Sequence, residues 1–342
     1  MKRFTSRPAL GQIVREISEM ARRFLAVCTG VFLLVGVVPS VVAAQAWIYV
    51  TQWGSFGYGD GQFNSPWGVA VGPDGRVYVA ARYNHSIQVF SGSGAFLGRW
   101  GTFGAGDGQF MYPLDVAVDV TGDVYVADQD NYRIQQFSSS GTYLLQWPAA
   151  VGSLDGPFGV AVDGNDNVYV ADYDNNRIQA FKASGTLQTQ WGTPGTGAGQ
   201  FNNPARVAVG PEGNVYVADT YNNRIQVFTS SGTYLTQWGS QGSGNGQFSL
   251  PYGLQVDAGG QVFVADTYND RVQVFTSNGG YLAQWGAHGS GNGEFLYPVS
   301  IAVDGSGCVY VADSGNNRIQ KFGPLPTPTK ATTWGRLKRL YR

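Results

Sequence analysis

Short runs of alternating apolar and polar residues, separated by turn-forming residues, fill the middle of the chain. One set of four follows in order as Arg206–Val209, Val215–Ala218, Arg224–Phe228 and Tyr234–Trp238. The runs are rich in Val, Ile, Tyr and Phe, and Gly, Pro, Asn and Ser stand between them. This is the pattern of short strands joined by tight turns. We therefore predict four antiparallel strands in this part of the chain.

The same four-strand unit recurs six times. The segment VYVADTYNNRIQVF, which starts at Val215, has five close relatives along the chain, and a tryptophan ends the fourth run of each unit. Successive units are 47 residues apart, with one interval of 44. A strand-rich repeat of this length is typical of a propeller or a solenoid, because one such sheet cannot bury both of its faces alone. The marker residues are Tyr78, Tyr125, Tyr169, Tyr216, Phe263 and Tyr310, with Trp53, Trp100, Trp147, Trp191, Trp238 and Trp285.

The two ends of the repeat region decide between a ring and an open solenoid. The last unit stops at Phe322 and lacks its fourth strand, while the segment WIYVTQW at 47–53 matches that strand. A closed ring needs this supplement and a solenoid does not. We therefore predict an all-β fold, a six-bladed β-propeller of four-stranded blades, in which the N-terminal strand completes the last blade. The 49 glycines and the 14% aromatic content suit such a protein.

The repeat also resembles a known family. Its pattern, P-x-G-V-A-V-x-x-x-G-x-V-Y-V-A-D-x-x-N-N-R-I-Q-x-F, is similar to the NHL repeat over residues 47–323. The Gly-His and Trp-Asp markers of WD repeats and the paired glycines of kelch repeats are absent. The resemblance implies a six-bladed propeller. It also implies two functional classes to weigh, since some NHL propellers bind RNA and the NHL-like amidating lyases are enzymes that use several histidines.

An Asp/Asn/Arg corner between the second and third strands is the first candidate site. The first unit has Ala81 and Ser86 in place of the aspartate and the arginine, so both residues are missing together. This joint loss indicates that the two side chains serve each other, and Asn in between suits a left-handed turn. We predict that the pairs are structural: Asp128 with Arg133, Asp172 with Arg177, Asp219 with Arg224, Asp266 with Arg271, and Asp313 with Arg318.

The long linkers between units and these corners are expected on the same face of the ring. Positions on that face that depart from the repeat are therefore the candidates for function. At the start of the inner strands, Asp115 and Arg206 stand where most other units have Gly. We predict that they lie near the axis and that an apolar, aromatic mouth surrounds them. The residues of that mouth are Trp67, Leu114, Phe158, Tyr252 and Val299.

The repeat region has two histidines, His85 in the first corner and His288 in the linker before the last unit. Ring closure makes their blades neighbours, so both are candidate binding residues. No cofactor is predicted. Under an alternative hypothesis, the protein is a metal-dependent lyase or hydrolase that binds Ca or Zn at the channel mouth through Asp115, with Arg206 and a histidine. The chain lacks the several histidines on which the amidating lyases rely.

Charge separates the binding hypotheses. Without its two terminal segments, the predicted propeller has a net charge of about −10. RNA binding needs a basic face, so no nucleic acid partner is expected.

The terminal segments predict an exported protein. Residues 1–46 resemble a signal peptide, with Arg22-Arg23 before an apolar run and cleavage near Ala46. An uncleaved leader would be long enough for a membrane anchor, and a start at Met20 would give a leader of ordinary length. Residues 324–342 form a Pro/Thr linker and a basic aromatic tail, either a disordered end or a tag for association with the cell envelope. We expect an exported monomer that acts as a binding scaffold for a protein, peptide or glycan, and not an enzyme.

Overall fold

The computed structural model describes residues 47–148 and 154–325. The predicted leader, the start at Met20 and the basic tail lie outside these residues, as does the middle of the shortened linker after Trp147. Within the described ranges, no helix is long and apolar enough to cross a membrane.

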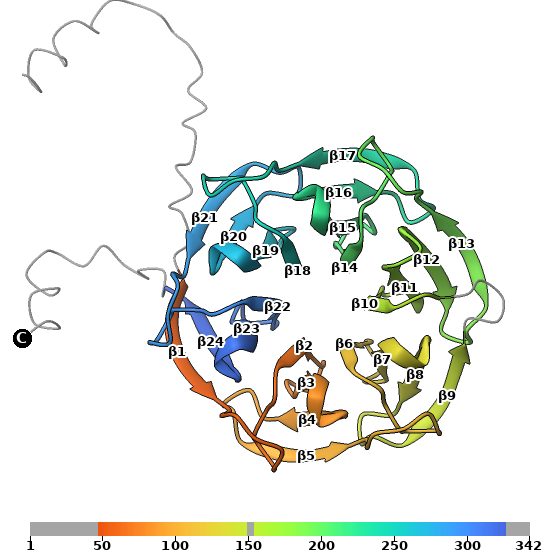
Figure 1. The fold of residues 1–342 in the computed structure, drawn as a ribbon, viewed down its shortest axis with the longest axis vertical. Helices are drawn as coiled ribbons and strands as arrows, with labels where there is room; N and C mark the ends of the chain where they lie inside the picture. Colours follow the sequence, from red (N-terminus) through yellow and green to blue (C-terminus); the bar gives the residue numbers. More distant parts are fainter. Residues whose placement is uncertain (1–46, 149–153, 326–342) are drawn as a thin grey trace, which may run out of the picture. The chain divides into compact units, whose positions relative to one another are not determined.

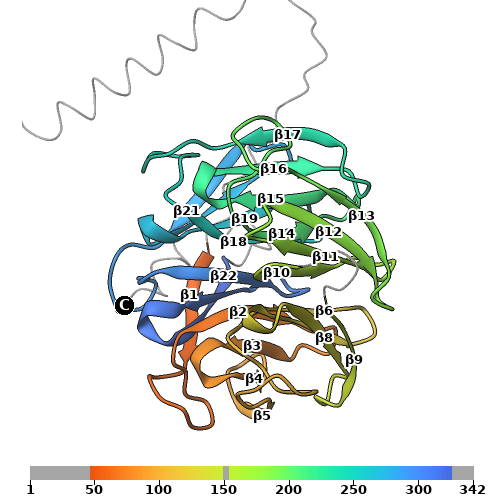
Figure 2. The same ribbon diagram turned by 45° about the vertical axis from the view of Figure 1, so that its right-hand side comes forward.

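The described residues form six four-stranded antiparallel sheets arranged as a ring around one axis (Figures 1 and 2). This confirms the predicted six-bladed β-propeller. Each blade runs outward in chain order, from an inner strand at the axis to an outer strand at the rim. Blades 1 to 3 are β2 (Pro66–Val71), β3 (Val77–Ala81), β4 (Ser86–Phe90), β5 (Phe96–Trp100); β6 (Pro113–Val118), β7 (Val124–Asp128), β8 (Arg133–Phe137), β9 (Tyr143–Pro148); and β10 (Pro157–Val162), β11 (Asn167–Asp172), β12 (Arg177–Lys182), β13 (Leu187–Trp191). Blades 4 to 6 are β14 (Pro204–Val209), β15 (Val215–Asp219), β16 (Arg224–Phe228), β17 (Tyr234–Trp238); β18 (Pro251–Val256), β19 (Val262–Asp266), β20 (Arg271–Phe275), β21 (Tyr281–Trp285); and β22 (Pro298–Val303), β23 (Val309–Asp313), β24 (Arg318–Pro324) with β1 (Trp47–Trp53).

The strands begin and end close to their predicted limits. In blade 4 the inner strand starts at Pro204, two residues before the predicted Arg206, because Pro204 already pairs with Asp219 of the next strand. A proline is tolerated at the first position of a strand, where its missing N–H costs no ladder bond.

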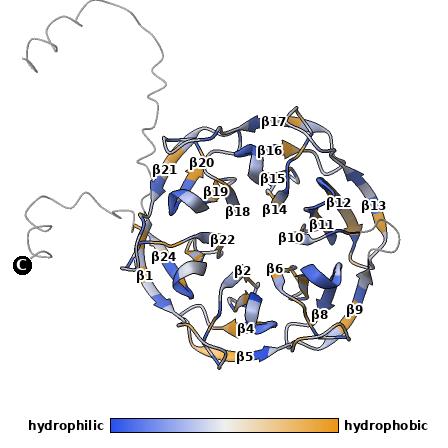
Figure 3. Cartoon of the chain, viewed as in Figure 1, coloured by the Kyte–Doolittle hydropathy of each residue, from blue (hydrophilic) through white to orange (hydrophobic). Residues whose placement is uncertain are grey.

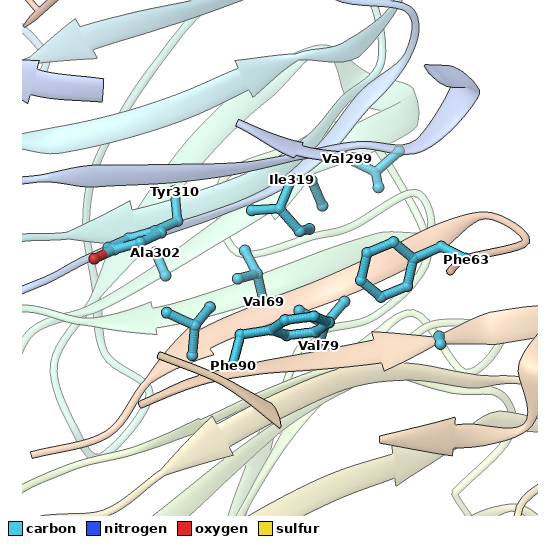
Figure 4. Close-up of a cluster of buried hydrophobic side chains, with 11 residues drawn as sticks. Phe63, Val69, Val79, Phe90, Val299, Ala302, Tyr310 and Ile319 are labelled. Carbon is cyan, nitrogen blue, oxygen red and sulfur yellow. The ribbon is translucent and has the colours of Figure 1, made fainter. Parts of the chain in front are cut away.

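Each blade is apolar on both faces because it packs between two neighbours. In β3, Val77 and Val79 point into the core shared with blade 6, while Tyr78 and Ala80 point into the core shared with blade 2. Figure 4 shows the core between blades 1 and 6. Six such cores alternate with the blades of the described ring, and Figure 3 shows hydrophobic segments recurring in the strands, with hydrophilic residues at several corner turns. Burial of both faces explains why each unit needs neighbours.

The N-terminal strand closes the ring as predicted. β1 pairs antiparallel with β24, from Trp47 opposite Pro324 to Trp53 opposite Ile319. Segments at the two ends of the repeat region are thus hydrogen-bonded partners in blade 6.

Five of the six outer-strand tryptophans of the described ring pack under a glycine turn of the next blade. Gly94 has φ +92°, and a Cβ atom on it would lie 2.6 Å from the Trp53 ring, so this position needs glycine. Trp285 is covered differently, since Trp47 of the closing strand stacks on it with ring centroids 5.2 Å apart and planes at 22°. The closing strand therefore supplies an aromatic ring where other blade junctions use a turn.

Candidate functional site

The Asp/Asn/Arg corners are buried ion pairs in five of the six corners of the described ring. In blade 4, Asp219 Oδ2 accepts from Arg224 Nε at 2.7 Å and from Gln226 Nε2 at 3.0 Å, while its Oδ1 accepts from Asn202 N at 2.8 Å. Asn222 Nδ2 donates to both oxygens. The carboxylate is fully buried, and its partners satisfy it. The same 2.7 Å distance joins Asp128 to Arg133, Asp172 to Arg177, Asp266 to Arg271, and Asp313 to Arg318.

The arginine of each pair fastens the linker that enters its blade. Arg224 donates through Nη1 to Thr196 O at 2.7 Å, and through Nη2 to Gly197 O at 2.8 Å and Gln200 O at 2.9 Å. Its Nη1 also reaches Gln237 Oε1 on the outer strand at 2.9 Å. All of its donors are used inside the protein, so this corner has a structural role.

The corner of blade 1 reaches the same connections with different residues. Ala81 has no carboxylate, and the Asn84 side chain accepts from Asn64 N at 2.7 Å in its place. Ser86 has no guanidinium, and Arg99 of the outer strand donates to Tyr58 O at 3.1 Å instead. Blade 1 therefore keeps its linker in place without the ion pair, and its corner residues are free to differ from the repeat.

Three aromatic side chains close the axis at the corner face. Trp67, Phe158 and Tyr252 come from blades 1, 3 and 5, and their ring centroids lie 5.7 to 6.3 Å from one another. Leu114 and Ala205 of the blades between them are fully buried against this group. The predicted aromatic residues do meet, but they fill the mouth with their own rings.

A polar group from the other three blades lies beside this plug. Asp115 of blade 2 and Arg206 of blade 4 form an ion pair across the axis, Oδ1 to Nη1 at 2.6 Å, and Arg206 Nη2 also donates to Ser300 of blade 6. Asp115 accepts backbone N–H groups from Val116 at 2.7 Å and Val160 at 2.9 Å. Both ionised side chains are at least 95% buried. Burial raises the pKa of Asp115 to about 6 although Arg206 opposes the shift, and burial lowers the pKa of Arg206.

This arrangement gives Asp115 and Arg206 a structural role. Asp115 and Arg206 lie together near the axis, as expected, where they line a small axial cavity of about 130 Å³ and are paired with each other. The oxygens of Asp115 already accept three donors, one of them a guanidinium, so a Ca or Zn ion does not fit there. Residues 47–148 and 154–325 contain no group of three His, Cys, Asp or Glu side chains arranged to hold a metal ion.

The two histidines lie at different blade junctions. His85 has a left-handed backbone, packs 4.9 Å from both Phe103 and Tyr112, and its Nδ1 accepts from Tyr112 N at 3.3 Å in the linker to blade 2. His288 lies in the linker to blade 6 and its Nδ1 contacts Asp270 Oδ2 of blade 5 at 2.8 Å. Blades 6 and 1 are neighbours, but each histidine faces away from the junction between them, so the structure does not bring the two together.

A pocket lined by three of the predicted mouth residues, Trp67, Tyr252 and Val299, opens on the corner face between blades 5, 6 and 1; its other lining residues were not predicted from the sequence. It has a volume of about 410 Å³, and we call it the tyrosine pocket. Blade 6 lines the pocket with Ser314, Gly315 and Val299, where its neighbours contribute larger side chains such as Tyr83 and Tyr268. Its lining residues are Ser65, Trp67, Arg82, Tyr83, Tyr252, Thr267, Tyr268, Tyr297, Val299, Ser314, Gly315 and Asn317.

Arg82 is the charged group of the tyrosine pocket. Its guanidinium carbon lies 4.6 Å from the Trp67 ring centroid, 5.0 Å from that of Tyr83 and 5.9 Å from that of Tyr112. Among the arginines of residues 47–148 and 154–325, it alone has no carboxylate within 4.0 Å. Its Nε is buried without a hydrogen-bond partner in the same residues. No acidic side chain lines the pocket.

The tyrosines around Arg82 leave hydroxyl groups available. In the described part of the chain, the hydroxyls of Tyr83, Tyr268 and Tyr297 have no hydrogen-bond partner, and these residues are 40%, 54% and 44% exposed. Burial and the neighbouring Tyr221 raise the pKa of Tyr252, so its phenol is neutral near pH 7. The pocket thus combines aromatic faces, hydroxyl groups and one unpaired cation.

Family comparisons agree with the fold. The NHL repeat matches residues 63–90, 110–137, 154–181 and 201–228, and a 6-bladed beta-propeller family matches residues 254–325. Over 57 residues, or 17% of this chain, the sequence is 46% identical to the B-box type zinc finger protein ncl-1 of Caenorhabditis elegans and 42% identical to the protein brain tumor of Drosophila melanogaster. These matches span only 7% and 6% of those two proteins.

Solved structures resemble the whole ring at low sequence identity. A Bacteroides thetaiotaomicron structural genomics protein has a TM-score of 0.66 at 19% identity, over 82% of this chain and 76% of that one. A Xanthomonas campestris gluconolactonase has a TM-score of 0.60 at 15% identity, over 78% and 88%. The Staphylococcus aureus virginiamycin B lyase, crystallised with quinupristin, has a TM-score of 0.57 at 16% identity, over 84% and 89%.

At this low sequence identity, the similarity to the solved structures shows only that the fold is shared. The repeats that match by sequence, the ring of four-stranded blades and the closing N-terminal strand lead to one assignment. The chain contains NHL repeats and is a six-bladed β-propeller.

Proposed function

We propose that this chain is an exported, monomeric binding module that takes a peptide or glycan ligand in the tyrosine pocket. One observation carries the proposal: an arginine without an acidic partner stands among exposed tyrosines at the corner that departs from the repeat. Regular corners use their polar groups internally, and this one presents them at the surface. A concave site with aromatic faces and a few polar groups is the usual form of a ligand site.

The position of the axial residues supports binding over a metal-dependent lyase or hydrolase. That alternative requires Asp115 and Arg206 to face a substrate, whereas both are buried and engaged with each other. The relatives of known activity share the fold, and fold does not determine function.

The test compares three forms of the purified protein on peptide and glycan arrays. The Tyr83→Ala/Tyr268→Ala variant removes two exposed rings of the pocket. The control is Tyr132→Ala, an exposed tyrosine of the blade 2 corner outside the pocket. We expect wild type and control to retain the same ligands and the double variant to lose them. Equal retention by all three forms, or conversion of a bound compound into product, would contradict the proposal.

Export is proposed from the sequence of residues 1–46. N-terminal sequencing of protein from the culture medium or the cell envelope is expected to begin near Trp47. Protein that stays in the cytoplasm with residues 20–46 still attached would contradict it. Association with the envelope through the basic tail is a separate proposal, and deletion of residues 331–342 is expected to release the protein from that fraction.

A further inference from the structure

We infer that the ligand of the tyrosine pocket is a carboxylated sugar, either free or as the terminal uronic acid of a glycan. The inference rests on the proposed binding function and adds the chemical class of the ligand. Three observations support it: the unpaired charge of Arg82, the exposed pocket tyrosines, and the backbone amides around the pocket, which are already hydrogen-bonded within the protein.

The first step is charge. On a propeller with a net charge of about −10, arginines find acidic partners readily, and the other arginines of the described residues all do. Arg82 instead lies against three aromatic rings, whose faces hold its planar guanidinium in place. A fixed guanidinium with free donors is suited to a carboxylate, which it can bind through two parallel hydrogen bonds. The ligand therefore carries an anionic group of this kind.

The second step is the state of the backbone around the pocket, which separates a sugar from an extended peptide. A peptide bound as an added strand needs unpaired backbone groups on the protein. Here the Ser65 amide donates to Asn317 Oδ1 at 2.9 Å, the Tyr297 amide to Asp270 at 2.8 Å, and the Gly315 amide to a backbone carbonyl at 2.8 Å. The binding groups that remain are hydroxyls and ring faces.

Those remaining groups match a pyranose ring. Tyr268 and Tyr297 meet at 61° with centroids 5.2 Å apart, so one ring of the pair presents its face while the other presents its edge. An aromatic face packs against the C–H face of a sugar, and nearby hydroxyls can bond to the hydroxyls of that sugar. The volume of about 410 Å³ is that of a small-ligand site. The sugar ring would lie among the tyrosines with its carboxylate toward Arg82.

The experiment is calorimetric titration of the purified protein with four probes. They are glucuronic acid, a tetramer of galacturonic acid, a neutral glucose tetramer and an acidic glutamate peptide. The test variant is Arg82→Gln, because the repeat itself carries Gln129 at this position in blade 2 and the corner is therefore expected to fold. The matched control is Arg76→Gln, an exposed arginine outside the pocket.

We expect the uronic acid probes to bind wild type and Arg76→Gln alike, and to bind Arg82→Gln at least about tenfold more weakly. Equal binding of the monomer and the tetramer indicates a free sugar acid as ligand, whereas preference for the tetramer indicates a glycan end. Binding of the neutral tetramer that does not change in Arg82→Gln would overturn this inference and leave the binding function standing. Binding of the glutamate peptide alone would overturn the sugar class. No binding of any probe would overturn the inference, while a ligand found on the arrays would still support the proposed function.

Discussion

Single residues decide which of these corners are structural and which are free to do something else. Both carboxylate oxygens of Asp219 accept two or more hydrogen bonds within its blade and the linker that enters it, and the paired Arg224 is nearly as buried. The attraction within such a buried ion pair contributes little net stability, but removing one partner is costly because it leaves the other charge buried without a counter-charge. Blade 1 has neither member of the ion pair. There, Asn84 and Arg99, an arginine of the outer strand, make the same connections to the entering linker.

Replacing Asp219 with Ala is expected to lower the free energy of unfolding by about 3–5 kcal/mol, because Arg224 then stays buried without a counter-charge. The double variant Asp219→Ala/Arg224→Ser, which copies Ala81 and Ser86, is expected to lose less than the single variant does. Urea denaturation measures both. A loss in the double variant equal to the sum of the two single losses would show that the residues act independently.

His85 gives stability a dependence on pH. Burial lowers its pKa below the ordinary 6.5, although Asp128 and Asp130 oppose the shift. The unfolded chain therefore binds a proton more readily than the folded one, and stability falls as the pH drops below about 6.5. Protonation also removes the Nδ1 acceptor used by Tyr112 N.

The variant His85→Asn keeps an acceptor, as Asn223 does in blade 4, and removes the titration. We expect the difference in unfolding free energy between wild type and variant to be constant above about pH 7. Below about pH 6.5, wild type is expected to lose stability relative to the variant. Using the difference cancels other groups such as Asp115, whose raised pKa gives the opposite slope in both proteins. A difference that does not change with pH would contradict this role for His85.

At the scale of strands, the inner ring alternates with a period of two blades. After the proline that starts each inner strand, blades 1, 3 and 5 have an aromatic residue and a glycine, as in Phe158-Gly159. Blades 2, 4 and 6 have an aliphatic and a polar residue there, as in Ala205-Arg206. The glycines let neighbouring inner strands approach closely. A Cβ atom on Gly159 would lie 2.6 Å from Ala205 O and 2.9 Å from Arg206 Cα.

The variant Gly159→Ala is therefore expected to push blades 3 and 4 apart and to cost about 1–3 kcal/mol of stability. Gly164→Ala is the matched control in the same blade, because a Cβ there meets no atom within 4 Å. Its effect is expected to stay within about 0.5 kcal/mol. Thermal unfolding of both variants tests this, and a loss of the same size in the control would contradict the packing argument.

The fold could be predicted from the sequence because each unit repeats its own turns and strands, and because segment 47–53 supplies the strand that the last unit lacks. The axial residues could be located but their roles could not, since a departure from the repeat such as Asp115 looks the same whether it faces a ligand or Arg206. The alternation of aromatic-glycine and aliphatic-polar pairs between successive inner strands is visible in the sequence, and it is the pattern from which the pairing of Asp115 with Arg206 could have been inferred. Trp67, Tyr252 and Val299 of the tyrosine pocket could be predicted as mouth residues, but the pocket also depends on Arg82 having no acidic partner, which only the assembled ring reveals.

For the molecule as a whole, the ring is held closed by one strand. Trp47 is 91% buried and stacks on Trp285 at the junction of blades 5 and 6. The exposed positions of the same strand contribute little to this contact, and Val50 is 51% exposed.

Replacing Trp47 with Ala is expected to lower the free energy of unfolding by about 3–5 kcal/mol, the usual cost of truncating a buried aromatic residue. Val50→Ala is the control, with an expected change within about 0.5 kcal/mol. Urea denaturation compares them, and equal losses would mean that Trp47 does not hold the ring closed.

The closing strand has a further consequence for how the protein is made. β1 leaves the ribosome first, but its partner β24 is about the last strand to appear, roughly 270 residues later. At about 5–20 residues per second, β1 waits roughly 15–55 s with its apolar side chains uncovered. During that time it can pair with the waiting edge of another nascent chain as well as with its own. Exchange of the first strand between two copies is therefore an assembly error to which this protein is exposed, and the risk rises with the concentration of nascent chains and falls as elongation becomes faster.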